Sequence, residues 1–222
     1  MHAARNGVCL LRVYEGSDVR NVALVGHLNS GKTSLTAAMA FATGATNRLT
    51  KVDEGNALTD YDEEEINRKI TISSAVAALE WKKYKINIID TPGFNIFTND
   101  VKQALKAADS VIAVVDGVAG IEVHTEKTWA LAEEYGLPRA IVINKLDRER
   151  ADFERALESV QKVFGRGAVA IQLPIGSERG FRGFIDLITM KAYEYTPGGD
   201  GKAHEIQIPG ALAADEIGRA HV

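Results

Sequence analysis

Short apolar runs alternate with longer stretches of helical periodicity along most of the chain. The runs, rich in β-branched residues, are 21–25, 86–89, 111–115 and 140–143. Nearly continuous apolar runs of this length are typical of parallel strands that are covered on both faces. Helices are expected at 34–42, 99–108, 122–135 and 151–164, and Gly136 followed by Pro138 is a typical end for the third of them. This alternation predicts an α/β fold with a doubly wound, mostly parallel sheet.

The pattern changes after residue 165. A strand is expected at 169–173, and further strand-like segments near 184–187 and 190–195 follow a glycine-rich stretch. A turn rich in Pro and Gly at 196–202 precedes a short extended piece at 205–209. We therefore expect a main α/β domain at residues 20–165 and the incomplete beginning of an inserted α+β subdomain at 166–215.

Both ends of the sequence look different from the rest. We interpret residues 1–19 as an N-terminal extension. The heptapeptide 216–222, Glu-Ile-Gly-Arg-Ala-His-Val, matches the in-frame translation of a common sequencing adaptor. Our hypothesis is that these seven residues are an artefact and that the natural protein continues beyond Asp215. Genomic sequence that runs smoothly through this stretch would refute it.

Composition narrows the class of protein. The 222 residues are 45% hydrophobic and 25% charged, which are ordinary values for a globular chain. With 26 basic and 30 acidic residues the formal charge is −4, so nucleic-acid contact would need a local patch. The one cysteine, Cys9, fits a reducing compartment, and the apolar run 8–11 is too short to span a membrane. We expect a soluble, cytoplasmic monomer without membrane contact.

A glycine-rich loop directly follows the first predicted strand. Residues 26–33, Gly26-His27-Leu28-Asn29-Ser30-Gly31-Lys32-Thr33, satisfy the pattern G-x-x-x-x-G-K-[ST] and precede a predicted helix. Its glycines let backbone N–H groups turn toward phosphate oxygens, and the helix N-terminus adds more of them. Lys32 would carry charge to the β- and γ-phosphates, and the Thr33 hydroxyl would bind Mg²⁺. A chance glycine turn fits this context poorly, whereas we interpret His27 as a structural loop residue.

A second motif at the end of a strand points to guanine. Asn144-Lys145-Leu146-Asp147 follows the apolar run 140–143. The Asp147 carboxylate can accept hydrogen bonds from N1–H and the 2-amino group of guanine, and it would repel adenine. Asn144 can reach N7 and the phosphate loop, while the Lys145 stem can cover the ring. Alone the pattern is weak and could be an exposed turn, but with the phosphate loop it predicts a guanine site.

Two further segments predict a nucleotide-sensing switch. Asp90-Thr91-Pro92-Gly93 ends the strand around 85–89, where Asp90 can hold Mg²⁺ through a water and the Gly93 N–H can reach the γ-phosphate. Arg68-Lys69-Ile70-Thr71-Ile72 follows the polar, acidic stretch 53–65 and begins a strand expected at 70–81. We expect this stretch to be a loop that is ordered when Thr71 binds Mg²⁺. Thr71 by itself would be read as an ordinary strand threonine.

The order of these motifs resembles the translational GTPases, and within them the elongation factor G group. The continuations Ala151-Asp152-Phe153, 173–176 and 183–187 are also similar to that group, so the likeness covers roughly 20–209. It implies a P-loop NTPase fold, with a GTP-binding domain at 20–165, GTP/GDP and Mg²⁺ as cofactors, and the ribosome as partner. It also implies hydrolysis coupled to ribosomal translocation, with four further domains absent from this chain. The family's last guanine-binding segment, a Ser-Ala pair, lies beyond the insert, and Gly176-Ser177-Glu178 is interpreted as a loop.

Two positions depart from the family pattern. Phe94 stands where the family usually has the histidine that orients the attacking water, and a phenyl ring cannot position water. Some elongation factor G-like paralogues have an aromatic residue there. Asn29 replaces a usual acidic residue. Its amide oxygen could still coordinate a cation near the phosphates, so we expect nucleotide binding to be altered in detail but retained.

The sequence thus predicts a Mg²⁺-dependent, ribosome-stimulated GTPase with slow intrinsic turnover. Lys32, Thr71 and Gly93 would support hydrolysis, and Thr33, Thr71 and Asp90 would hold the metal. Three alternatives stay open. One is a ribosome-bound paralogue for recycling or protection that has no translocase role. The others are an ATP-using P-loop kinase, which Asp147 argues against, and a scaffold that no longer hydrolyses GTP.

Overall fold

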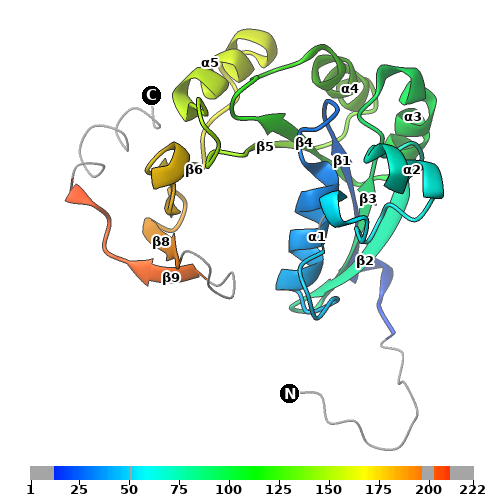
Figure 1. The fold of residues 1–222 in the computed structure, drawn as a ribbon, viewed down its shortest axis with the longest axis horizontal. Helices are drawn as coiled ribbons and strands as arrows, with labels where there is room; N and C mark the ends of the chain where they lie inside the picture. Colours follow the sequence, from blue (N-terminus) through cyan, green and yellow to red (C-terminus); the bar gives the residue numbers. More distant parts are fainter. Residues whose placement is uncertain (1–12, 51, 197–202, 211–222) are drawn as a thin grey trace, which may run out of the picture.

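The computed structural model describes residues 13–50, 52–196 and 203–210, which form two sheets (Figure 1). The larger sheet has the strand order β2-β3-β1-β4-β5. Its strands are β1 (Val19–Val25), β2 (Ala75–Trp81), β3 (Tyr84–Asp90), β4 (Ser110–Asp116) and β5 (Arg139–Asn144). Strand β2 runs antiparallel to β3, and the other three neighbouring pairs are parallel. The predicted α/β fold with a mostly parallel sheet is confirmed.

Helices cover both faces of this sheet. They are α1 (Lys32–Ala42), α3 (Thr98–Ala107), α4 (Val123–Glu134) and α5 (Phe153–Phe164), while the short helix α2 (Glu63–Arg68) lies in the segment before β2. The alternation along β1 explains the two layers, because Ala23 and Val25 pack in a cluster with α3 and α4, whereas Leu24 packs toward α1 (Figure 1). All three side chains are fully buried. Each face of the sheet therefore has its own apolar layer, as the continuous apolar runs require.

The second sheet is antiparallel and follows α5 in the chain. Its strands, in the order β6-β7-β8-β9, are β6 (Gln172–Ile175), β7 (Gly183–Asp186), β8 (Lys191–Tyr195) and β9 (Ala203–Ile206). A small core that includes Leu173, Ile185 and Ala192 lies on it, and Phe153 at the start of α5 packs against that core. This contact joins the small sheet to α5. The sheet resembles the beginning of the insert subdomain that the sequence predicted.

Four short 3₁₀ turns complete the described residues. They are η1 (Gly16–Asp18), η2 (Val52–Glu54), η3 (Asn95–Phe97) and η4 (Glu178–Gly180). The predicted adaptor artefact at 216–222 and the turn at 197–202 lie outside the described residues, as does most of the predicted extension at 1–19.

The acidic stretch expected to be a loop contains helix α2. Asp62 caps this helix by accepting the Glu64 N–H at 2.8 Å, and Glu65 completes a capping box. Glu65 is buried and its Oε1 accepts the N–H groups of Ile72 and Ser73 at 2.9 and 3.0 Å. These bonds hold the residues after Thr71 in a turn, so β2 begins at Ala75 and not at residue 70 as predicted.

Two strand boundaries in the second sheet also differ from the prediction. Strand β6 begins at Gln172, three residues after the expected start, and it leaves Val169 and Ile171 exposed. Strand β9 is Ala203–Ile206 and not 205–209, because its register is set by pairing with β8 from Tyr195 to Ala192. Apolar content alone placed these strands, whereas hydrogen-bond pairing decides where they begin and end.

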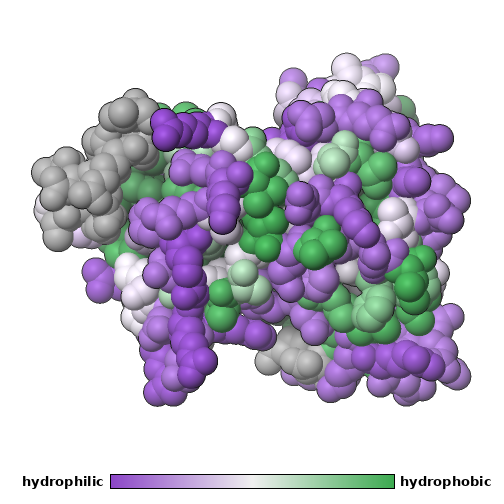
Figure 2. All heavy atoms as spheres, turned by 90° about the horizontal axis from the view of Figure 1, so that it is seen from above, coloured by the Kyte–Doolittle hydropathy of each residue, from purple (hydrophilic) through white to green (hydrophobic). Residues whose placement is uncertain are grey.

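On the face seen in Figure 2, hydrophilic area alternates with small, separate hydrophobic patches. Isolated exposed apolar side chains of this kind are normal for a globular chain. Among the helices that the structure describes, none has the length and apolar character needed to cross a membrane.

Candidate nucleotide-binding site

The motifs meet at the carboxyl ends of the parallel strands. The phosphate loop joins β1 to α1, Asp90 ends β3, and Asn144 ends β5. A cavity of about 410 Å³ opens beside the loop. It is lined by Leu28, Asn29, Gly31, Lys32, Thr33, Ser34, Val52, Asp60, Arg68, Lys69, Ile70, Thr71, Gly93, Lys145 and Arg148. Cationic side chains outnumber carboxylates among these described residues, so the cavity suits a polyanion such as a nucleotide polyphosphate.

The phosphate loop needs a backbone conformation that favours glycine. Gly31 has φ 97°, a left-handed conformation that places it directly before α1. The Lys32 ammonium donates hydrogen bonds to the carbonyls of Gly26 and His27 at 3.1 and 2.9 Å. Burial lowers the pKa of Lys32 from 10.5 to about 8, although Asp90 opposes the shift. This cation is thus held by loop carbonyls and is poorly solvated, which favours exchange of these carbonyls for phosphate oxygens.

Two threonines predicted to bind metal lie in contact. The hydroxyls of Thr33 and Thr71 are 3.1 Å apart, and the Thr71 hydroxyl donates to Asp60 Oδ1 at 3.1 Å. Burial, followed by repulsion from Asp90, raises the pKa of Asp60 from 3.8 to about 6. Neutralising such a group takes either a proton or a cation.

Asp90 is buried at the base of the same group. Its Oδ2 accepts the Thr59 hydroxyl at 2.7 Å, whereas its Oδ1 has no hydrogen-bond partner. Burial raises the pKa of Asp90, and the hydrogen bond from Thr59 opposes the shift. The unpartnered Asp90 Oδ1, the hydroxyls of Thr33 and Thr71 and the Asp60 carboxylate together form a set of hard oxygen donors. Such a set fits Mg²⁺.

Gly93 approaches the phosphate loop closely. A Cβ atom at this position would lie 2.7 Å from the Leu28 nitrogen and 2.7 Å from Lys32 Nζ. Such distances exclude any side chain, so the loop after β3 can pack onto the phosphate loop only with glycine here. The structure therefore brings together the phosphate loop and the turn 91–93 that follows Asp90.

Phe94 follows this contact and turns toward the surface. Its side chain is 41% exposed, and its carbonyl accepts the Phe97 N–H at 3.0 Å at the start of η3. The ring has no polar atom, so a water beside it would have to be held by other groups.

His27, within the phosphate loop, contacts the start of α4. Its backbone N–H donates to the Thr125 hydroxyl at 3.1 Å, and its Nε2 lies 3.4 Å from Glu122 Oε1. His124 in the same turn of α4 is buried, and burial lowers its pKa. The contacts of His27 tie the phosphate loop to α4.

The guanine motif reaches the phosphate loop through two side chains. Asn144 Nδ2 donates to the Ser30 carbonyl at 2.9 Å, as the sequence suggested, and Lys145 Nζ donates to the Asn29 carbonyl. Lys145 Nζ also lies 2.8 Å from Asp116 Oδ2. Asp147 is exposed and is not among the residues that line the 410 Å³ cavity. The structure therefore does not bring Asp147, the carboxylate predicted to recognise guanine, into this cavity.

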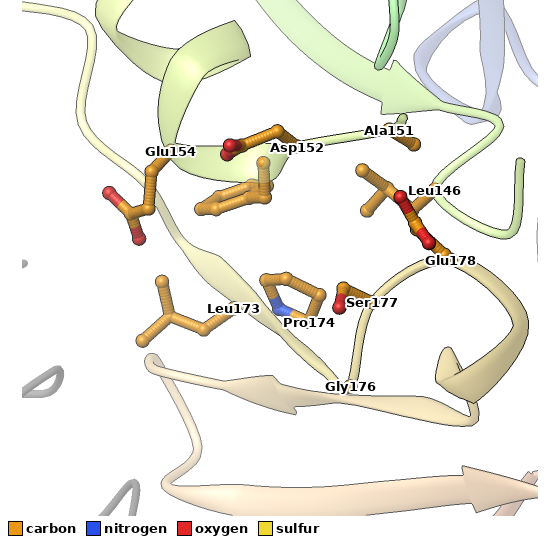
Figure 3. Close-up of a pocket in the computed structure, with 10 residues that line it drawn as sticks. Leu146, Ala151, Asp152, Glu154, Leu173, Pro174, Gly176, Ser177 and Glu178 are labelled. Atoms are coloured by element: carbon orange, nitrogen blue, oxygen red, sulfur yellow. The ribbon is translucent and has the colours of Figure 1, made fainter. Parts of the chain in front are cut away.

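Leu146 points to a second cavity of about 510 Å³ between α5 and the small sheet. Figure 3 shows Asp152 and Glu154 on the α5 side facing Leu173 and Pro174 of β6, with Leu146 and Glu178 at one end. The rim is anionic where the first cavity is basic, so this space does not extend the phosphate site.

Sequence reasoning missed Thr59, Asp60, Glu65 and Asp116. Asp116 ends β4 as Asp90 ends β3, so its place at a strand end was an available signal. For Thr59, Asp60 and Glu65 nothing in the local pattern distinguishes them from other polar residues of the acidic stretch. Their contacts appear only when this stretch folds against β3 and the phosphate loop.

Comparisons with known proteins identify the family. The family model for the Elongation factor Tu GTP binding domain matches residues 17–212. Elongation factor G of Granulibacter bethesdensis is 42% identical over 196 residues, which are 88% of this chain and 28% of that protein. Elongation factor G of Wolbachia pipientis subsp. Culex pipiens is 44% identical over 176 residues, 79% of this chain and 26% of that protein.

The fold agrees as well. A crystal structure of a protein from Thermus thermophilus has a TM-score of 0.84 and 36% sequence identity, and the match covers 92% of this chain and 30% of that one. The chain thus spans less than a third of the length of these relatives. It belongs to the Elongation factor Tu GTP binding domain family, and it is an elongation factor G-like translational GTPase domain.

Proposed function

We propose that this domain binds Mg²⁺·GTP in the 410 Å³ cavity and hydrolyses it to GDP and phosphate. One observation carries the proposal: the phosphate loop, the Thr33–Thr71 pair and the Asn144–Lys145 segment all meet at one basic cavity. These groups come from distant segments of the chain: Thr33 and Thr71 are 38 residues apart, and Ser30 and Asn144 are 114 apart. Each group would bind a different part of Mg²⁺·GTP: the phosphates, the metal or the base.

The residues divide the work between phosphate, metal and base. The N–H groups of 26–31 and the Lys32 ammonium bind the phosphate oxygens, and the Gly93 N–H meets the γ-phosphate. Thr33, Thr71 and Asp90 would hold Mg²⁺, with Asp60 adjacent. When bound, Mg²⁺ neutralises charge on the β- and γ-phosphates. Asn144 and Asp147 recognise the guanine edge, and the Lys145 stem covers its ring.

Hydrolysis in this site depends on positioning and electrostatic stabilisation. Lys32, Thr71 and Gly93 together hold the γ-phosphate and its metal in place for an attacking water. We propose that the ribosome is the partner that stimulates this step. The domain would act, as a monomer, within an elongation factor G-like protein that drives ribosomal translocation. The similarity to elongation factor G supports this assignment.

Phe94 favours a second candidate function. A phenyl group at the position next to Gly93 cannot hold the attacking water, so hydrolysis would be slow and the GTP-bound state long-lived. Such kinetics suit a ribosome-associated paralogue that works by binding, in recycling or in ribosome protection, without a translocase role. The rate of ribosome-stimulated hydrolysis distinguishes the two candidates.

Equilibrium binding of a fluorescent GDP analogue to the chain tests the primary proposal. We expect GTP and GDP to displace the analogue and ATP to displace it poorly. Chelation of Mg²⁺ should weaken binding of the analogue. Lys32→Met should abolish binding, while Lys191→Met, which removes an exposed lysine of β8, should leave it unchanged. Equal displacement by ATP would overturn guanine selection, and no binding by the wild type would overturn the proposal.

A further inference from the structure

Asp116, which lies outside the motifs that the sequence singled out, forms a largely enclosed ion pair with Lys145. Its Oδ2 lies 2.8 Å from Lys145 Nζ, and the two side chains are only 13% and 15% exposed. By contrast, the Lys191–Glu205 pair in the small sheet has the same 2.8 Å separation but side chains that are 47% and 56% exposed. Water screens the Asp116–Lys145 pair little because it is so enclosed. The two charges therefore interact strongly, and removing either one is costly.

Asp116 is itself held rigidly by the backbone. Its Oδ1 accepts the Val118 N–H at 2.8 Å, and the adjacent Gly117 N–H donates to the Asn144 carbonyl at 2.8 Å. Burial alone would raise the pKa of Asp116, but the hydrogen bonds from Lys145 and Val118 outweigh burial and hold it below 3.8. Asp116 is therefore a fixed anion at the end of β4, directly opposite Asn144 in the β4–β5 register.

Lys145 is constrained at both ends of its side chain. Its backbone has φ 61°, a left-handed conformation that costs free energy for a residue other than glycine. Its ammonium is shared between the Asp116 carboxylate and the Asn29 carbonyl of the phosphate loop. The aliphatic stem thus spans from the end of β5 to the phosphate loop in one defined conformation.

We propose that Asp116 is a positioning residue for the nucleotide: it fixes the Lys145 ammonium so that the aliphatic stem of Lys145 forms a rigid surface for the purine ring. This inference rests on the proposed binding of a guanosine nucleotide. Without the Asp116 carboxylate, the lysine loses its buried counter-charge and its stem samples other conformers, so the bound base is released sooner. The phosphates are held by the main chain of the phosphate loop, so hydrolysis of bound GTP is unaffected.

The test uses Asp116→Asn, which removes the charge and keeps the shape. We expect the dissociation rate constant of a fluorescent GDP analogue to rise about tenfold, the equivalent of one charge-assisted hydrogen bond. KM for GTP should rise in parallel, with the single-turnover rate at saturating GTP unchanged. Glu205→Gln breaks the exposed pair of equal length and serves as the matched control, with no expected effect.

A double-mutant cycle shows whether Asp116 acts through Lys145. Lys145→Met should also speed GDP release, and adding Asp116→Asn to it should change little, because the group that Asp116 positions is gone. Additive effects of the two substitutions would overturn the proposal, as would an unchanged dissociation rate in Asp116→Asn.

If instead the proposed nucleotide binding is wrong, the wild type will bind no GDP at all, which distinguishes that outcome from a failure of the Asp116 proposal. Should Asp116→Asn not fold, as judged by circular dichroism, Asp116→Glu decides the question. Its carboxylate is displaced by one methylene, so faster release at an unchanged hydrolysis rate supports the proposal, and wild-type release contradicts it.

Discussion

Replacing Thr59 with valine removes one buried hydrogen bond and nearly preserves the volume of the side chain. The Thr59 hydroxyl donates to Asp90 Oδ2 at 2.7 Å, and the two residues are 2% and 0% exposed. Loss of a hydrogen bond that leaves a buried partner unsatisfied costs about 1 to 3 kcal/mol. For a domain of this size about 2 kcal/mol corresponds to a fall in Tm of roughly 6 °C.

Thermal unfolding of the nucleotide-free chain measures this loss. Thr98→Val is a matched control, because the Thr98 hydroxyl makes an equally short bond, 2.6 Å to the Asn95 carbonyl, at an exposed site. We expect the control to change Tm by no more than about a degree, since exposed groups exchange their bonds with water. Equal Tm values for the two variants would refute the importance of burial at Thr59.

The same variant reports on the metal site. In the proposed function Asp90 holds the water shell of Mg²⁺ through its unpartnered Oδ1, and Thr59 fixes the same carboxylate through Oδ2. We therefore expect Thr59→Val to bind Mg²⁺·GDP more weakly than the wild type, with an upper limit of about 30-fold for about 2 kcal/mol. Equal or tighter binding, measured by titration calorimetry, would show that Thr59 does not position Asp90 for the metal.

Three further predictions address the base, the charge of the phosphate loop and the rate of hydrolysis. Asn144→Ala removes the 2.9 Å bond to the Ser30 carbonyl and the proposed contact with N7, so GDP affinity should fall at least about tenfold in a fluorescence titration; unchanged affinity would contradict this placement. Because burial lowers the pKa of Lys32 from 10.5 to about 8, the unfolded chain binds more protons between these values. The free energy of unfolding without nucleotide should therefore rise from pH 8 to pH 10, by at most about 3 kcal/mol, and urea titrations of Lys32→Met should lack this rise. Phe94→His should increase the ribosome-stimulated single-turnover rate of GTP hydrolysis about 100-fold, and a wild type as fast as this variant would show that Phe94 does not limit hydrolysis.

The main sheet could be predicted because its signals are local. Each strand is a short apolar run, and in β1 the alternation of Ala23 and Val25 with Leu24 already implies two buried faces. Errors occurred where hydrogen bonding rather than apolarity sets the boundary of a strand. Glu65 illustrates this, since its carboxylate binds backbone N–H groups seven and eight residues later and delays the start of β2. In the sequence that glutamate is indistinguishable from its acidic neighbours.

The phosphate and guanine motifs could be predicted because they need particular residue types at fixed short spacing. Gly31 and Lys32 lie next to each other in the chain, and backbone geometry alone places them at the start of α1. Contacts between distant segments could not be predicted in this way. The Thr59–Asp90 bond joins residues 31 apart, and the Asp116–Lys145 pair joins residues 29 apart. No local pattern records which polar residue of a loop will face which strand end.

The sequence by itself therefore determined the strands and helices, the phosphate loop and the candidate guanine motif, since each depends on neighbouring residues. Only the tertiary structure decided which carboxylates are buried beside the threonines, which anion holds Lys145, and that Phe94 turns toward solvent. The reason is that burial and ion pairing depend on how distant segments pack. The free energy of a charged group changes strongly with that packing, while its identity in the chain stays the same.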